Sequence, residues 1–298
     1  DVFSSDLQRG IDRFRELGAR LVVDPHAALL EDHVALGVDV GAAVRGEHQF
    51  SRALAQSPRV TFDPEVTIAG FPFTSQSSAG HFDGATIAAR GVELPGCPPA
   101  RGVCRGELGA SLGPFDVADG SGFSASDVLH TSSISAYTRL DAVTLARYLR
   151  IVDLTVSTPG PDDTAGAGGP QDGIVSRETG VVLTGTVALP PGDGLDPADP
   201  PSASSYDGPK VRVSVSVDLS VVDGALDIRA TGFYTGPERH VDAEVPAEVR
   251  AAVLDRFSLT LPRLPMAWDV EPDRAESFGG DVQLVGDSGP ASVRLDRF

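Results

Sequence analysis

The chain has 298 residues, of which 41% are hydrophobic, and its formal net charge is −18. This length suits a globular protein of one large domain or two. The negative charge argues against nucleic acid as a partner, because binding to phosphates requires clustered Lys and Arg. It also argues against a broad electrostatic attraction to anionic lipid headgroups. No run approaches the ~18 consecutive apolar residues of a membrane-spanning helix.

The N-terminal part of the chain predicts two helices. The first begins after Ser5 and forms an extension over residues 1–23. The second begins at Asp24-Pro25, with proline at the first helical position, and ends before Pro58. Its glycines weaken it as an isolated helix, so we expect packing to hold it in place. Its predicted apolar stripe comprises Leu36, Val40, Ala43, Val44, Phe50 and Leu54.

Residues 66–94 predict a strand, a short turn and a second strand. Apolar and polar residues alternate up to Gly70, and Gly70-Phe71-Pro72-Phe73 then places two aromatic residues around a rigid proline. The polar run 74–78 predicts one helical turn closed by Gly80. The strand pattern of the second strand shifts by one residue at Arg90-Gly91, which predicts a β-bulge. On pattern alone, these apolar side chains belong to an ordinary core.

The rest of the chain is predicted to be mostly strands. A hairpin is expected over residues 210–234, with its turn at Asp223-Gly224. Two shorter helices are expected over residues 141–151 and 246–257, and polar loops over 158–173 and 191–208. These elements predict an α+β fold in which an antiparallel sheet packs on a few helices.

Catalytic and metal-binding patterns are weak. The string Gly109-Ala110-Ser111-Leu112-Gly113 matches the G-x-S-x-G of serine hydrolases, but that motif needs a strand before it and a helix after it. Pro114 and Phe115 follow instead, so a hydrolase is only the third hypothesis. The six histidines are scattered and the acidic loops lack the spacing of a calcium-binding loop. We therefore predict no catalytic residue, no metal and no cofactor.

Two segments resemble the LmeA-like phospholipid-binding family of actinobacterial cell-envelope proteins. The first segment lies within residues 66–94. The second is residues 259–266, which resemble the family's LP-x-LP segment. Where family members often carry LTQ and a leucine pair, this chain has the more polar residues 74–78. The resemblance covers roughly residues 30–298. The first segment matches at Gly70, Phe71, Pro72, Phe73, Gly80, Phe82, Asp83, Ala89, Gly91 and Val92.

The resemblance implies a fold similar to tubular lipid-binding proteins such as bactericidal/permeability-increasing protein. In that fold a long helix lies along a strongly curved antiparallel sheet, whose concave apolar surface holds acyl chains. Residues 24–298 would form this lipid-binding domain. The periodicity of the strands indicates only a sheet that is compatible with such a groove.

The resemblance also implies a function: a non-catalytic phospholipid carrier that assists maturation of mannosylated lipoglycans. Its partners would be a phospholipid or another acyl lipid, with transient membrane contact. The alternative is an interaction or scaffold module that binds a protein. Arg45 and Arg52, seven residues apart on one helix face, are the headgroup candidates. The predicted lining of the lipid groove is Val66, Ile68, Phe71, Phe73, Ile87, Leu261, Leu264, Met266 and Trp268.

An envelope location bears on the two cysteines, Cys97 and Cys104. Six residues that include Pro and Gly separate them, so we expect a disulfide in an extracytoplasmic protein. Two free thiols in a reducing compartment are the alternative. Zinc is not expected, because no second Cys pair or nearby His exists. The sequence begins at Asp1, without a Met and without a visible signal peptide. We therefore expect a mature or truncated form whose signal or anchor lies upstream.

Overall fold

The computed structural model describes residues 25–98, 102–117, 122–158, 180–190, 200–203, 206–236 and 240–298, with side chains from residue 37 onward. The predicted extension 1–23 and most of the predicted loops 158–173 and 191–208 lie outside the described residues. Among the described helices, none is long and apolar enough to cross a membrane.

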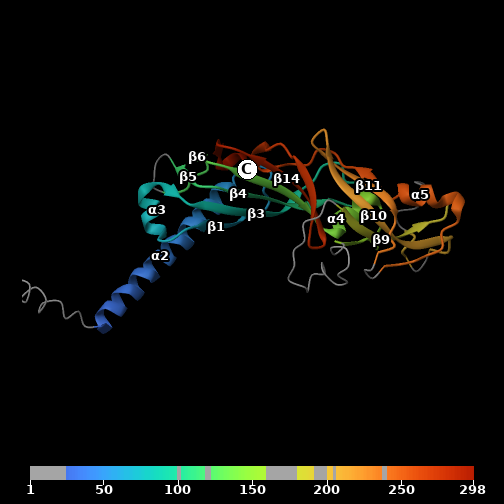
Figure 1. Cartoon of the computed structure of the whole chain (residues 1–298). Helices are drawn as coiled ribbons and strands as arrows, with labels where there is room; N and C mark the ends of the chain where they lie inside the picture. The colour runs from blue at the N-terminus through green and yellow to red at the C-terminus, as the bar shows by residue number, and fades with distance from the viewer. Residues whose placement is uncertain are drawn as a thin grey trace, which may run out of the picture.

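The strands form three antiparallel sheets, which Figure 1 shows along an elongated molecule. The six-stranded sheet has the order β1 (Glu65–Ala69), β3 (Gly84–Glu93), β4 (Arg105–Leu112), β7 (Ile134–Leu140), β14 (Asp281–Ser288) and β13 (Arg274–Phe278). The five-stranded sheet has the order β12 (Leu259–Thr260), β11 (Ala225–Phe233), β10 (Lys210–Val222), β9 (Gly180–Ala188) and β8 (Thr155–Ser157). The four-stranded sheet has the order β15 (Ala291–Arg294), β6 (Val128–Thr131), β5 (Phe115–Val117) and β2 (His81–Phe82). The α+β class with antiparallel strands is confirmed, and within the described residues each sheet is open.

Helices cover the two ends of this arrangement. At one end α2 lies beside β1 and α3 beside α2 and β2, and at the other end α5 lies beside β11 (Figure 1). Helix α4 follows β7 directly and packs against it, between the two ends. The helices are α2 (Pro25–Leu54), α3 (Phe73–Ala79), α4 (Ala142–Leu149) and α5 (Arg250–Asp255), with single 3-10 turns η2 (Ala247–Val249), η3 (Ala267–Asp269) and η4 (Leu295–Arg297).

Several local predictions are confirmed. The hairpin turns at Asp223-Gly224, where both residues have positive φ angles of 51° and 74°. Gly80 ends α3 in the left-handed conformation. The pairing of β3 with β4 shifts register between Arg90 and Val92, which is the predicted bulge. In each case the deciding signal lies within a few residues of sequence.

Helix α2 contacts the sheets differently from the expected stripe. Phe50 and Leu54 are fully buried as predicted, whereas Val40 and Val44 are more than half exposed. Asp39 and Gly46 instead face the protein, because α3 packs on that side of the helix. The N-terminal part of α2 extends away from the sheets (Figure 1). The described helix therefore packs on the sheet only through its C-terminal part.

Candidate lipid-binding site

The Gly70-Phe71-Pro72-Phe73 motif joins β1 to α3 and is held by a carboxylate from α2. Asp39 accepts hydrogen bonds from the backbone N–H groups of Phe73 and Thr74, both at 2.8 Å, and from the Thr74 hydroxyl at 2.7 Å. The Thr74 backbone N–H is the main cause that lowers the pKa of Asp39. A buried acid in the middle of α2 thus caps the first turn of α3.

Phe73 closes this end of the molecule together with four other aromatic rings. Its ring lies on the backbone of Gly46, where an added Cβ would come within 2.3 Å of Phe73 Cζ. It also packs on Phe82, with ring centroids 5.9 Å apart. We call the whole set the aromatic cluster, which comprises Phe50, Phe73, Phe82, Phe115 and Phe123.

The nine predicted groove residues do not all occupy one environment. Seven of them are at most 9% exposed and belong to one continuous core: Val66, Ile68, Phe73, Ile87, Leu261, Leu264 and Met266. Trp268 is partly buried and packs against that core. Phe71 points away from it and is 67% exposed. The two headgroup candidates, Arg45 and Arg52, are exposed on α2, and Arg52 pairs with Asp63 at 3.3 Å.

Residues 261–268, here called the strap, connect the five-stranded sheet to the six-stranded sheet. At one end the Leu261 N–H donates to the Leu226 carbonyl at 2.9 Å. Near the other end Thr138 of β7 donates to the Pro265 carbonyl, and Arg59 Nη1 donates to the Met266 carbonyl at 3.1 Å. The strap therefore brings its apolar residues onto the same core as β1 and β3.

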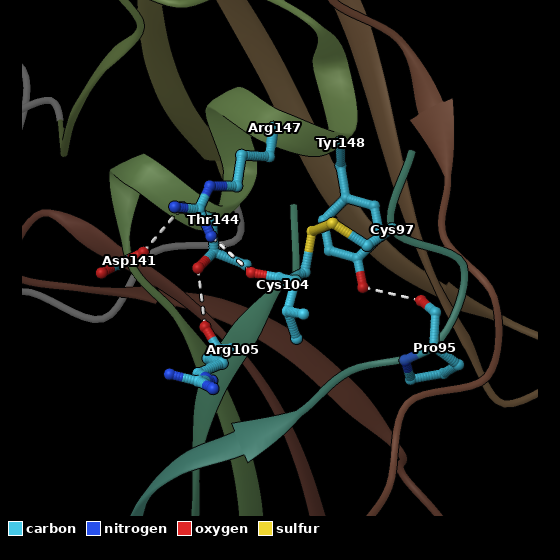
Figure 2. Close-up of a disulfide and its surroundings, with 9 residues drawn as sticks. Pro95, Cys97, Cys104, Arg105, Asp141, Thr144, Arg147 and Tyr148 are labelled. Carbon is cyan, nitrogen blue, oxygen red and sulfur yellow. Dashed lines mark hydrogen bonds between the residues drawn. A yellow bond between two sulfur atoms is a disulfide. The ribbon is translucent and has the colours of Figure 1, made fainter. Parts of the chain in front are cut away.

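The disulfide between Cys97 and Cys104 is confirmed, and helix α4 holds the loop that it closes. Figure 2 shows three side chains of α4 that reach this loop. Arg147 donates to the Val103 carbonyl, Thr144 Oγ1 to the Arg105 carbonyl at 2.6 Å, and the Tyr148 hydroxyl to the Pro95 carbonyl at 2.7 Å. Burial raises the pKa of Tyr148 to about 12, because the surrounding protein disfavours the charged phenolate.

A pocket of about 640 Å³ lies beside the disulfide loop, and we call it the arginine pocket. Its volume falls within the range of about 300–1,000 Å³ that is usual for ligand sites. Leu259, Thr260 and Pro262, from the second family-like segment, form part of the wall. The lining residues are Gly96, Pro98, Tyr148, Leu149, Arg150, Ala252, Asp255, Arg256, Ser258, Leu259, Thr260 and Pro262.

Another pocket, of about 270 Å³, lies on the polar face of the six-stranded sheet. Here Glu107 pairs with Arg90 and with Arg139, at 3.2 Å in each case, and accepts a hydrogen bond from Tyr137 at 2.8 Å. The acidic and basic side chains here form a row across neighbouring strands and neutralise one another. The row is thus a set of cross-strand pairs that stabilise the sheet.

The geometry gives no support to the hydrolase hypothesis. Ser111 lies inside β4, paired with Thr86 of β3 and Ser135 of β7, and no strand-to-helix turn follows it. Among the described residues, no group of three or more His, Cys, Asp or Glu side chains could hold a metal ion.

Sequence reasoning missed the arginine pocket and the role of Asp39. The pocket combines three segments that are far apart in the chain, 96–98, 148–150 and 252–262, so no local pattern predicts it. Arg150 did carry a signal, since it occupies the position after α4 where helices commonly place glycine. Asp39 carried another, as an acidic residue between two valines of a helix.

These features define an α+β protein with open antiparallel sheets, one continuous apolar core and a ligand-sized pocket. The chain belongs to the LmeA-like phospholipid-binding family, whose model matches residues 37–287. No significant match was found among curated proteins or among solved structures.

Proposed function

We propose that this protein is a non-catalytic phospholipid carrier of the cell envelope that assists maturation of lipoglycans such as mannan. The family match over most of the chain carries the proposal. The Cys97–Cys104 disulfide supports an extracytoplasmic location, because disulfides persist in oxidising compartments.

The energetics of acyl chains favour a carrier over a trap. Burial of an acyl chain is favourable by ~0.8 kcal/mol per CH₂ relative to water. A lipid in a bilayer already has this stabilisation, so its exchange into an apolar protein interior is nearly neutral. The protein then shields the chains during transfer through water, which is the step that would cost most.

The acyl chains are proposed to contact both family-like segments. Such a chain would contact Ile68 and Ile87 of β1 and β3 together with Leu264 and Met266 of the strap, which belong to the same core. These side chains are buried in one core, so the bound chain must displace the strap or its neighbours. The strap crosses from one sheet to the other without being a strand of either along most of its length, which supports such movement.

Membrane contact is proposed at the end that carries α2 and α3. Phe71, Val40 and Val44 are exposed apolar side chains at this end. Arg45 and Arg52 lie on the same helix and are proposed to meet lipid phosphates. If reversal of both arginines to Glu leaves binding to anionic vesicles unchanged, the arginines have no such role.

The function is tested with lipid-free protein and a fluorescent phospholipid. We expect saturable binding, and transfer between vesicles that rises with protein concentration. Ile68→Gln and Leu261→Trp should weaken binding with little change in thermal midpoint if these residues line the lipid. Leu129→Gln is the matched control, since Leu129 is fully buried but belongs to the four-stranded sheet, and it should unfold the protein.

Two outcomes would contradict the proposal. If every groove variant unfolds like Leu129→Gln, the predicted lining is ordinary core. If native mass spectrometry finds a co-purified protein partner and no lipid, and added phospholipid does not bind, the interaction-module alternative is favoured.

A further inference from the structure

Two arginines from different parts of the chain line the arginine pocket. Arg150 follows α4, and Arg256 follows α5. We propose that this pocket binds the phosphate of an anionic phospholipid headgroup through Arg150 and Arg256. The inference rests on the proposed lipid-binding function and names a headgroup site for the carried lipid, separate from the membrane contact proposed at Arg45 and Arg52.

Arg150 sits in a backbone conformation that is unusual for its residue type. Its φ angle is 59° and its ψ angle 36°, which is the left-handed region that glycine adopts most easily. No described residue forms an ion pair with the side chain of Arg150. Glycine would relieve the backbone strain here, so the arginine side chain is the feature that calls for a functional explanation.

Arg256 is held at the same pocket by the end of α4. Its Nη2 donates to the Leu149 carbonyl at 3.4 Å, one residue before Arg150. A guanidinium has five N–H donors in a planar fork and can contact several acceptors at once, which suits phosphate oxygens. Both arginines therefore belong to one contiguous part of the pocket wall.

The remaining wall fits a lipid better than a soluble anion. Leu259 and Pro262 offer apolar surface on which the glycerol backbone and the first acyl carbons can pack. Asp255 is the acidic residue in the lining and can accept a hydrogen bond from a headgroup hydroxyl. The lining thus brings two basic residues together on a protein whose net charge is −18. An anionic headgroup is therefore bound locally, without general attraction to negative surfaces.

The walls of the pocket are fixed by covalent and hydrogen-bonded contacts. The disulfide loop reaches the strap at Gly96, where an added Cβ would lie 2.6 Å from Pro262 Cγ. The hydroxyl of Tyr148, which lines the pocket, donates a hydrogen bond to the Pro95 carbonyl beside the same loop. The pocket is thus preorganised, which lowers the entropic cost of binding.

The test measures binding of three probes by calorimetry: dihexanoyl phosphatidylglycerol, the phosphate-free dihexanoylglycerol, and inorganic phosphate. Arg150→Gly and Arg256→Gln should each weaken binding of the phosphatidylglycerol by about tenfold, the usual effect of losing a charged hydrogen bond. Binding of dihexanoylglycerol should not change. The Arg297→Gln control removes the same charge from an exposed arginine outside the pocket and should bind normally.

Arg150→Gly separates binding from folding. Because glycine tolerates the left-handed conformation, the thermal midpoint of this variant should equal or exceed that of the wild type. Weaker headgroup binding in a protein of undiminished stability supports a direct role for the side chain. If Arg256→Gln fails to fold, Arg150→Gly alone decides.

The outcomes distinguish the inference from the function on which it rests. If the wild type binds the phosphatidylglycerol and both arginine variants bind it equally well, the headgroup site is wrong and the lipid function stands. If only inorganic phosphate binds, and does so through the arginines, the pocket takes a soluble anion and both the headgroup assignment and the lipid function fail. If no probe binds, both are overturned.

Discussion

The two ends of the molecule differ in how completely side chains fill the interior. At the α2–α3 end, five aromatic rings fill the interior, and apolar side chains such as Phe71 are displayed outside. Toward the α5 end, beside the disulfide loop, a pocket of about 640 Å³ remains open and carries charged groups. The first of the two family-like segments lies at the filled end, and the second borders the open pocket. A sequence motif can therefore mark the architecture of a binding protein while the ligand-sized space lies elsewhere.

The filled end depends on close ring packing. Phe82 and Phe115 stack with centroids 5.1 Å apart, and Phe50 and Phe123 stack at 4.6 Å. Phe82 → Ala should lower the free energy of unfolding by about 3–5 kcal/mol, because a large cavity forms in a rigid cluster. Urea denaturation measures the change. Phe71→Ala is the control and should stay within about 0.5 kcal/mol of the wild type. A loss below about 1 kcal/mol for Phe82→Ala would mean that the cluster is not rigid.

The open end depends on the disulfide. The Cys97→Ser, Cys104→Ser double variant should lose about 2 kcal/mol of stability, since the closed loop is short. The pocket wall at Gly96 should loosen with it, so phosphatidylglycerol binding should weaken as well. Wild-type protein in reductant serves as the control and should reproduce both effects in calorimetry and denaturation. Normal lipid binding by the double variant would show that the loop does not shape the pocket.

The exposed aromatic at the filled end sharpens the comparison further. Phe71 → Ala should reduce binding to phospholipid vesicles several-fold with an unchanged thermal midpoint, because an exposed phenyl ring gains by leaving water. Phe62→Ala is the matched control: Phe62 is 62% exposed, close to the 67% of Phe71, but it lies over the Gly91 bulge. Co-sedimentation with vesicles measures both variants. Equal losses would show a general effect of surface hydrophobicity and no specific membrane contact at Phe71.

The smallest effect is expected for the carboxylate that joins α2 to α3. Hydrogen bonds lower the pKa of Asp39 below its ordinary value of 3.8, so its stabilisation is present above pH 4 and disappears as the pH falls further. Asp39→Asn should lower the thermal midpoint at pH 7, and the difference from the wild type should shrink below pH 4. A difference that is independent of pH would assign the effect to shape and not to charge.

Local chemistry explains what could be predicted from the sequence. Asp141 caps α4 through the Thr144 N–H at 2.7 Å, and Asp223-Gly224 turns the hairpin; both patterns are complete within a few residues. The exposed face of α2 could not be predicted from the sequence. The side that faces inward is decided by hydrogen bonds to Asp39 from Phe73 and Thr74, which lie 34 and 35 positions later in the chain. The arginine pocket was hidden for the same reason: Arg150 and Arg256 meet only when the chain has folded.

The pairing of β7 with β14 has a consequence for how the chain is made. Residues 134–140 leave the ribosome long before residues 282–288, with which they form a ladder. Until then the edge of β7 has no partner on that side, and the whole five-stranded sheet must be synthesised in between. Contacts so distant in sequence fold slowly, and unpaired strand edges invite aggregation. Helix α4 directly follows β7. Its early packing against that strand would cover part of the incomplete sheet during synthesis.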